Sequence, residues 1–177
     1  MNRLAVIVAL GLGSVMFVAR ADVLEDATAA IHRKDWPAAV RLLEPLARSG
    51  HAVAQWRMGL LYYHGHGVRE SDAAARDWFE KAARQGLADA QFELANMVIY
   101  GLVDAPTGED PARVAAQWYF EAAMQGHPQA QYSLGILYLT GSGVQVSADE
   151  ANKWIGRAAA QGHADAVAYL KGRAGPR

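Results

Sequence analysis

A nine-residue phrase that recurs three times constrains the fold of this 177-residue chain more than any other feature. It reads WFEKAARQG at 78–86, WYFEAAMQG at 118–126 and WIGRAAAQG at 154–162. The closing glycines, with a fourth at Gly50, are spaced 36, 40 and 36 residues apart, and an alanine four residues after each glycine keeps the same spacing. Self-similarity at a fixed period of this length predicts an array of stacked structural units.

Each unit contains two helical patterns on either side of a glycine-rich loop. In the unit that starts at residue 54, Ala54, Met58 and Tyr62 fall four residues apart and so share one helix face. Trp78 and Ala82 mark a second helix in the same way. The loop glycines and the unit-ending glycines stand where a tight turn and a left-handed helix stop are expected. The pattern therefore predicts antiparallel helix hairpins.

The middle unit departs from the pattern at its loop. Its sequence GLVDAPTGEDP is four residues longer than the loops of the other units, and Ala95 and Val98 replace a glycine and a tyrosine. Insertions in repeat proteins map to loops at one edge, which is often the binding side. We expect this loop to project from the array.

The spaced positions A-x-[aromatic]-x-[L/M]-G-x-x-Y-x-x-G-x-G-V, followed by A-x-x-W-[aromatic]-x-x-A-A-x-x-G, resemble the Sel1-like repeat family, which is a tetratricopeptide-like family of helical hairpins. The resemblance implies an all-α fold, a right-handed superhelical solenoid of antiparallel helix hairpins with about four hairpins and a C-terminal capping helix. The units run as follows: a divergent N-terminal hairpin that acts as a cap at 22–53, repeats at 54–89, 90–129 (with the lengthened loop) and 130–165, and a capping helix with a tail at 166–177.

The first 21 residues, MNRLAVIVALGLGSVMFVARA, differ from the rest of the chain. A basic start, an uncharged apolar run and a small-x-small ending predict a secretory signal peptide that is cleaved after Ala21. We therefore expect a periplasmic or secreted protein with no membrane span after cleavage; the alternative is that the segment is kept as an anchor.

The balance of 17 basic and 18 acidic residues is not that of a nucleic-acid-binding protein.

The residues capable of chemistry do not form a recognisable catalytic set. The chain has no cysteine, which excludes disulfides and thiolate chemistry. His51, His127 and His163 each follow a unit-ending glycine, which indicates a role at the helix boundary. His64 and His66 are not repeated, and a zinc site there would have only Glu70 as a nearby third ligand. We expect no enzymatic activity, no cofactor and no metal.

One arc on the first helix of each unit is not used by the repeat-defining positions. Because the first helices line the concave surface in helical-hairpin solenoids, this arc predicts a partner-binding groove with an apolar floor and Tyr100 as an aromatic anchor. The expected partner-binding residues are Arg57, Leu60, Leu61, His64, Glu93, Asn96, Met97, Tyr100, Ser133, Ile136, Leu137 and Thr140. The alternative is that the apolar members pack against the second helix of their own unit.

The function that these observations favour is a protein–protein interaction module that binds a partner protein in the concave groove. The partner's identity is open, and we expect a monomer or a weak homo-oligomer. Two alternatives remain: an immunity or inhibitor protein that neutralises a secreted toxin, such as a type VI effector, in the periplasm, which rests on the family resemblance, and an envelope enzyme acting on cell-wall material.

Overall fold

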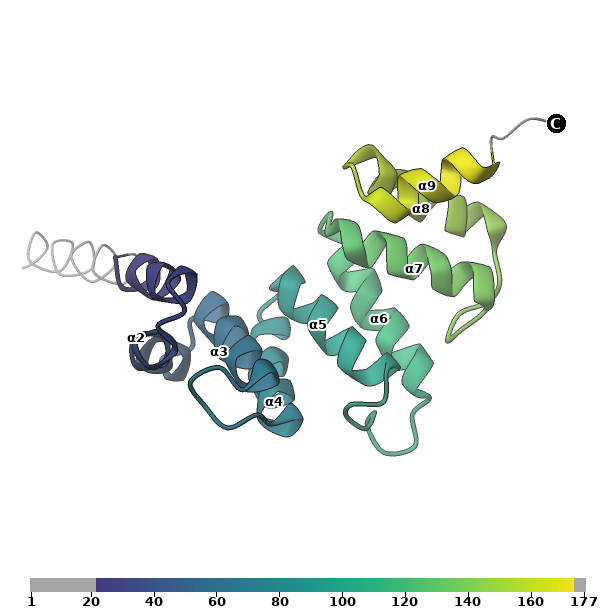
Figure 1. The fold of residues 1–177 in the computed structure, drawn as a ribbon. Coiled ribbons are helices and arrows are strands. Elements are labelled where there is room, and N and C mark those ends of the chain that lie inside the picture. Colours follow the sequence, from purple (N-terminus) through teal and green to yellow (C-terminus); the bar gives the residue numbers. More distant parts are fainter. Residues whose placement is uncertain (1–21, 174–177) are drawn as a thin grey trace, which may run out of the picture.

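A computed structural model describes residues 22–173 as an all-α array (Figure 1). The expected signal peptide and the last four residues of the tail lie outside the described residues. A helical segment at 22–32 is followed by eight helices. Their bounds are α2 (Trp36–Arg48), α3 (Ala52–His64), α4 (Asp72–Ala83), α5 (Ala88–Ile99), α6 (Pro111–Met124), α7 (Pro128–Thr140), α8 (Ala148–Ala160) and α9 (Ala164–Arg173).

Each helix packs mainly against the next one along the chain, so the array grows in one direction. The hairpins α3–α4, α5–α6 and α7–α8 have the most extensive contacts, and each hairpin packs on the following one through α4–α5 and α6–α7. At the ends, α2 packs on α3 and α9 packs on α8. Figure 1 shows that the stacked hairpins follow a bent path. The predicted all-α solenoid is confirmed.

Side-chain caps and glycines set the ends of the helices. The hydroxyls of Ser71 and Ser147 accept hydrogen bonds from the backbone N–H groups at the starts of α4 and α8, and Asp110 caps α6 ahead of Pro111. Every unit-ending glycine has a positive φ, from 84° at Gly162 to 93° at Gly50. The predicted left-handed helix stops are therefore present in the structure.

Close packing within a hairpin depends on small residues opposite large ones. A Cβ atom added to Gly59 would lie 2.5 Å from the ring of Phe79, and one added to Gly135 would lie 2.5 Å from Ile155. In the middle hairpin, Ala95 stands at the position of these glycines. Phe79 and Ile155 are fully buried, so the missing methyl group lets the two helices of a hairpin approach each other.

A ladder of glutamine amides connects successive hairpins. One buried glutamine near the start of α3, α5 and α7 donates to a backbone carbonyl at the end of the preceding helix and accepts from a second glutamine at the end of its own hairpin. The pairs are Gln55 with Gln85 at 2.6 Å, Gln91 with Gln125 at 2.7 Å and Gln131 with Gln161 at 2.8 Å. The carbonyls are those of Ala47, Ala83 and Ala123, at 3.0, 3.2 and 3.1 Å. Each of these carbonyls also accepts from the backbone N–H of the glycine that ends its unit, so the ladder adds a second hydrogen bond at the end of the helix.

Candidate partner-binding surface

Three of the twelve predicted partner-binding residues lie in the core, which corrects the sequence-based assignment. The exposed fractions of Leu61, Met97 and Leu137 are 3%, 2% and 7%. Each belongs to a cluster of buried side chains that joins its helix to neighbouring helices. A rotation of about one helix position separates a groove-facing residue from a core residue, and sequence periodicity does not resolve that difference. The apolar floor is therefore wrong at these three positions.

The other apolar residues of the predicted floor are half-buried. Leu60 packs against the core cluster around Phe79, and Ile136 packs against the cluster around Ile155. By contrast, His64, Tyr100 and Thr140 at the ends of the three first helices are exposed, and Tyr100 has an exposed fraction of 74%. The accessible part of the predicted surface is thus more polar than its sequence indicates.

The side chain of Arg57 is engaged by the N-terminal cap. Its Nη1 atom lies 3.4 Å from the carbonyl oxygen of Leu24 and makes a short contact with the hydroxyl of Thr28. Partial burial lowers the pKa of this guanidinium. Arg57 therefore joins the helical segment 22–32 to α3.

Four predicted residues gather around one buried hydroxyl at the centre of the array. Tyr119 on α6 is 3% exposed, and its hydroxyl donates to Asn96 Oδ1 at 2.7 Å. Burial is the main cause that raises the pKa of Tyr119. Tyr100 and Glu93 raise this pKa further, and the interaction with Ser133 lowers it. The structure thus brings together residues of α5 and α7 that the sequence placed on the same surface, and it adds Tyr119, which the sequence reading missed.

Glu93 has an unusual environment for a carboxylate. It is half-buried, and its Oε2 atom has one long contact, 3.5 Å, with Asn96 Nδ2. Burial raises the pKa of Glu93, the Asn96 contact opposes the shift, and the negative charge of Asp89 adds to it. Among the described side chains, no ion pair involves Glu93. Its charge is therefore left without a cation from residues 22–173.

The histidines that follow the unit-ending glycines cap the next helix. In His51, His127 and His163, Nδ1 accepts the backbone N–H three residues ahead, at 3.4, 3.2 and 3.4 Å. Leu87, at the fourth such position, makes no side-chain cap. This arrangement confirms the predicted role at the helix boundary.

His127, which caps α7, also contacts two side chains of α5. Its ring stacks on Phe92 with a centroid distance of 4.8 Å, and its Nε2 atom lies 3.6 Å from Asp89 Oδ1. Burial lowers the pKa of His127, and Asp89 partly opposes that shift. Since Nδ1 accepts a hydrogen bond, a neutral ring carries its proton on Nε2, directed toward Asp89.

The unrepeated histidine pair lies against the N-terminal cap. His66 stacks on Trp36 with ring centroids 4.1 Å apart, and His64 lies 5.4 Å from His66. Within the part of the chain that the structure describes, no group of three or more His, Asp or Glu side chains is placed to hold a metal ion. The same part of the chain contains no helix with the length and hydropathy of a membrane span.

Comparison with protein families decides the identity of the repeat. The Sel1 repeat model matches residues 52–87, 88–127 and 128–163. The chain belongs to the Sel1 repeat family. The three Sel1 repeats begin two residues before the units read from the sequence, at the first residues of α3, α5 and α7.

Two relatives of this Sel1 repeat chain carry the description "exopolysaccharide production negative regulator". The one from Rhizobium meliloti (strain 1021) is 34% identical over 145 residues, which cover 76% of this chain and 53% of the relative. The one from Rhizobium leguminosarum bv. viciae is 31% identical over 142 residues, which cover 75% and 53%. The chain spans about half the length of the curated relatives it matches.

Solved structures show the same fold. A Sel1 repeat protein from Oxalobacter formigenes superposes with a TM-score of 0.74 at 32% identity, covering 82% of this chain and 56% of that one. A protective antigen present in uropathogenic Escherichia coli strains, which displays the same fold, superposes with a TM-score of 0.69 at 34% identity, covering 76% and 28%. These similarities support a protein-interaction module of the Sel1 repeat type.

Proposed function

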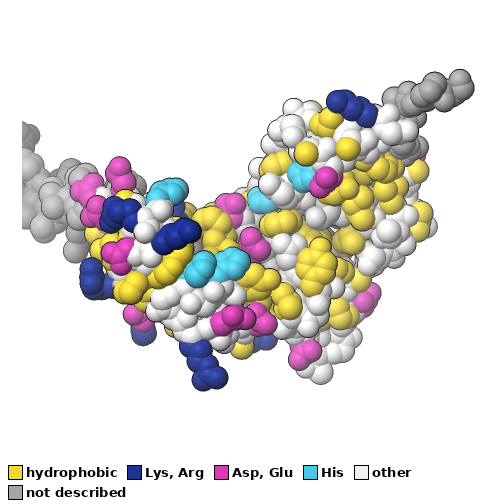
Figure 2. Space-filling model, in the orientation of Figure 1, with side chains coloured by type: hydrophobic (Ala, Val, Ile, Leu, Met, Phe, Trp, Pro, Cys, Tyr) yellow, Lys and Arg dark blue, Asp and Glu magenta, His cyan; other side chains and the backbone are white. Residues whose placement is uncertain are grey.

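We propose that this chain is a protein-binding scaffold that acts in the periplasm or outside the cell and holds its partner along α5. The surface that we assign to the partner is the α5 stripe, defined as Asp89, Glu93, Asn96 and Tyr100. These residues are spaced by four, three and four positions, so they lie along one face of the helix. Figure 2 shows acidic side chains over this part of the array, at the bottom of its hollowed side, with histidines on both sides.

The unpaired carboxylate of Glu93 carries this proposal. A carboxylate that is partly removed from water and lacks a cation is costly to the folded chain. A lysine or arginine side chain of a partner would supply the missing charge, and the exposed ring of Tyr100 at the end of the stripe would pack against its aliphatic part. The partner therefore presents a basic side chain to the centre of the hollow.

Site-specific photo-cross-linking tests where the partner lies. Tyr100 is replaced by p-benzoylphenylalanine, and the same replacement at the exposed Gln117 of α6 serves as the matched control. We expect one discrete cross-linked partner from position 100 that is lost in a Glu93→Lys background and is absent from position 117. Equal cross-linking from both positions, or cross-linking that survives Glu93→Lys, would show that the α5 stripe is not the binding surface.

The compartment is tested separately, on the N-terminus. The expected cleavage after Ala21 predicts that the exported protein begins at Asp22, which intact-mass spectrometry of the periplasmic fraction measures. A protein that retains Met1 and fractionates with the cytoplasm would contradict export. That result would leave the assignment of the α5 stripe intact, since cross-linking can be repeated in the compartment found.

A second candidate function is negative regulation of exopolysaccharide production, which is favoured by the names of the two Rhizobium relatives. A scaffold could exert such regulation by holding a partner in an inactive complex. Expression of this chain in a Rhizobium meliloti strain that lacks the relative should then reduce exopolysaccharide yield, and Glu93→Lys should cancel the effect. Unchanged yield with a stably expressed protein would remove this candidate.

A further inference from the structure

A pocket opens on the side of the array formed by the second helices. It has a volume of about 450 Å³ and lies between α4, α5 and α6, with residues 104–107 of the lengthened loop as one wall. Its floor consists of Leu94, Val98, Val114 and Trp118. The first three are buried and the last is half-buried. The volume falls in the range of ligand pockets, and the site shares no residue with the α5 stripe.

The floor of the pocket lacks a tyrosine that the other two repeats have at the equivalent position. Tyr62 and Tyr138 occupy the position of Val98 in the other two repeats. Both rings are half-buried and pack against core clusters that include the preceding second helix. At position 98 the chain has an isopropyl group in place of a phenol, so the volume that a ring fills in the other repeats remains open here.

The loop wall is displaced for a related reason. In the third repeat, Gly143 lies so close to α6 that an added Cβ would come within 2.2 Å of the backbone of Ala112, and Gly67 approaches Trp36 similarly in the first repeat. Val103 stands at the equivalent position of the middle repeat and carries a Cβ. With this Cβ the loop cannot make the same close approach that the two glycines make.

The hydrogen bond that closes the other two loops is also replaced in the middle repeat. Ser71 and Ser147 each donate from the backbone to the carbonyl of the repeat's tyrosine, at 3.0 Å. The carbonyl of Val98 instead accepts from Gly101 at 3.1 Å. The lengthened loop thus turns away early and leaves the space above Val98 as a pocket.

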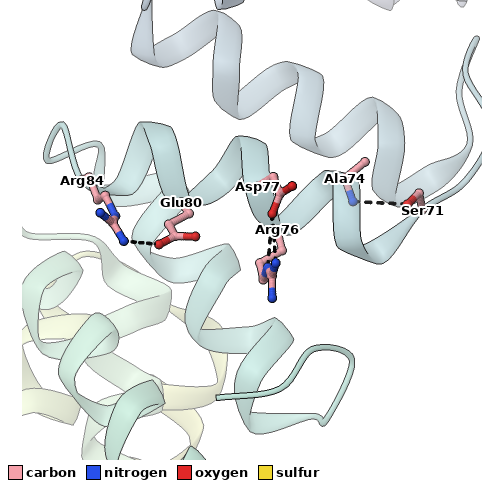
Figure 3. Close-up of polar contacts among 6 residues, drawn as sticks. All are labelled: Ser71, Ala74, Arg76, Asp77, Glu80 and Arg84. Atoms are coloured by element: carbon pink, nitrogen blue, oxygen red, sulfur yellow. Dashed lines mark hydrogen bonds and ion pairs between the residues drawn. The ribbon is translucent and has the colours of Figure 1, made fainter. Parts of the chain in front are cut away.

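The rim of the pocket matches the polar end of a tyrosine. Arg84 lies two residues before its unit-ending glycine, as Arg48 does in the preceding unit. The guanidinium of Arg84 and the carboxylate of Glu80 both line the pocket. Figure 3 shows Arg84 paired with Glu80 and Arg76 paired with Asp77 along α4.

The charges around the pocket favour a neutral occupant. The lining contains two arginines, one glutamate and one aspartate, so its formal charges cancel. A carboxylate or an ammonium group would each meet a like charge at this rim. A phenol has an apolar ring for the floor and a neutral hydroxyl that can both donate to Glu80 and accept from Arg84.

We propose that this pocket accepts a tyrosine side chain of a partner protein. Its ring lies against Leu94, Val98 and Trp118, in the volume that the sister repeats fill with their own tyrosine, and its hydroxyl meets the Glu80–Arg84 pair. This contact adds a second, aromatic anchor point to the chain, on a surface separate from the α5 stripe, and it does not depend on the function proposed for that stripe.

The test uses the purified protein and N-acetyl-L-tyrosinamide as the probe, followed by NMR of the Leu and Val methyl groups. We expect saturable shifts at Leu94, Val98 and Val114, with N-acetyl-L-phenylalaninamide binding roughly fivefold more weakly because it lacks one hydrogen-bonding group. N-acetyl-L-lysinamide should cause no saturable shift. Absence of saturation with the tyrosine probe, or equal binding of the lysine probe, would overturn the proposal.

Two variants tie the binding to this pocket. Val98→Tyr restores the residue of the sister repeats and should abolish the shifts at Leu94 and Val114, whereas the control Val98→Ile should retain them. Arg84→Met changes an exposed side chain and should lower the affinity for the tyrosine probe to that of the phenylalanine probe. Persistent binding in Val98→Tyr, or an unchanged preference for tyrosine in Arg84→Met, would contradict the assignment.

Discussion

The hydroxyl of Tyr119 donates to Asn96 Oδ1 at 2.7 Å, so α6 and α5 are joined by a polar contact that the other two repeats replace with apolar packing. At the two positions the first repeat has Phe79 and Leu60. Of the three repeats, the middle one is therefore the one with a side-chain hydrogen bond at this place between its two helices. The same hairpin carries the α5 stripe, and together with α4 of the preceding repeat it forms the pocket.

This pair predicts a compensating double substitution. Tyr119→Phe leaves a half-buried amide without its donor and should lower the free energy of unfolding by about 1 kcal/mol. Adding Asn96→Leu, the residue of the first repeat, should recover most of that loss because both polar partners are then absent. Urea denaturation of the two single variants and the double variant measures the coupling. Strictly additive losses would contradict a direct hydrogen bond.

Because Met97 is buried, its truncation should lower the stability of the fold, whereas truncation of a residue in the floor of an open groove should not. Met97→Ala should lower the free energy of unfolding by roughly 2–5 kcal/mol, because it leaves a cavity in the core. Tyr100→Ala, three residues away on the same helix but exposed, should change it by less than about 0.5 kcal/mol. Equal effects of the two substitutions in thermal or urea unfolding would show that Met97 is accessible after all.

The glutamine ladder should be a measurable source of stability. Gln91→Ala removes both the donor to the carbonyl of Ala83 and the acceptor for Gln125, and should cost about 1–3 kcal/mol of unfolding free energy. The control is Gln129→Ala, which changes an exposed glutamine two residues before Gln131 on α7. A Gln91→Ala variant as stable as the control would mean that water replaces the ladder at no cost.

Protonation of Glu93 should make the stability of the folded chain depend on pH. Burial raises its pKa in the folded state above the unfolded value, so the folded chain binds the proton more tightly. Stability contributed by this group is therefore present at low pH and is lost as the pH rises through the raised folded pKa. Glu93→Gln should be more stable than the native chain at neutral pH, and the difference should disappear below the unfolded pKa. A difference that is independent of pH would contradict the assignment.

The repeats and the caps could be predicted from the sequence because each is marked by local residues. Gly50, Gly86, Gly126 and Gly162 keep the helix stops in register, and Ser147 and Asp110 mark helix starts without tertiary information. The partner-binding surface could not be predicted from the sequence residue by residue. Leu60 and Leu61 are adjacent in sequence, yet one is half-buried at the surface and the other is core, because neighbouring helices decide which arc is covered.

Other features had a sequence signal whose meaning only the structure supplies. The glutamines of the ladder recur with the repeat, but recurrence alone does not distinguish a hydrogen-bonded side chain from a solvated one. The replacement of tyrosine by Val98 and the longer loop are visible in the sequence, yet the pocket follows only when Arg84 and the loop residues 104–107 are placed around Val98. The role of Arg57 in holding the segment 22–32 likewise depends on a contact between residues far apart in the chain.

The central claim is that the α5 stripe holds the partner through the charge of Glu93. Once cross-linking from position 100 has identified the partner, titration calorimetry should show that Glu93→Gln weakens binding by about tenfold or more, because a basic side chain of the partner loses its counter-charge. The matched control, Glu121→Gln on the exposed side of α6, should leave the dissociation constant unchanged. Equal affinities for the native chain and Glu93→Gln would contradict the account.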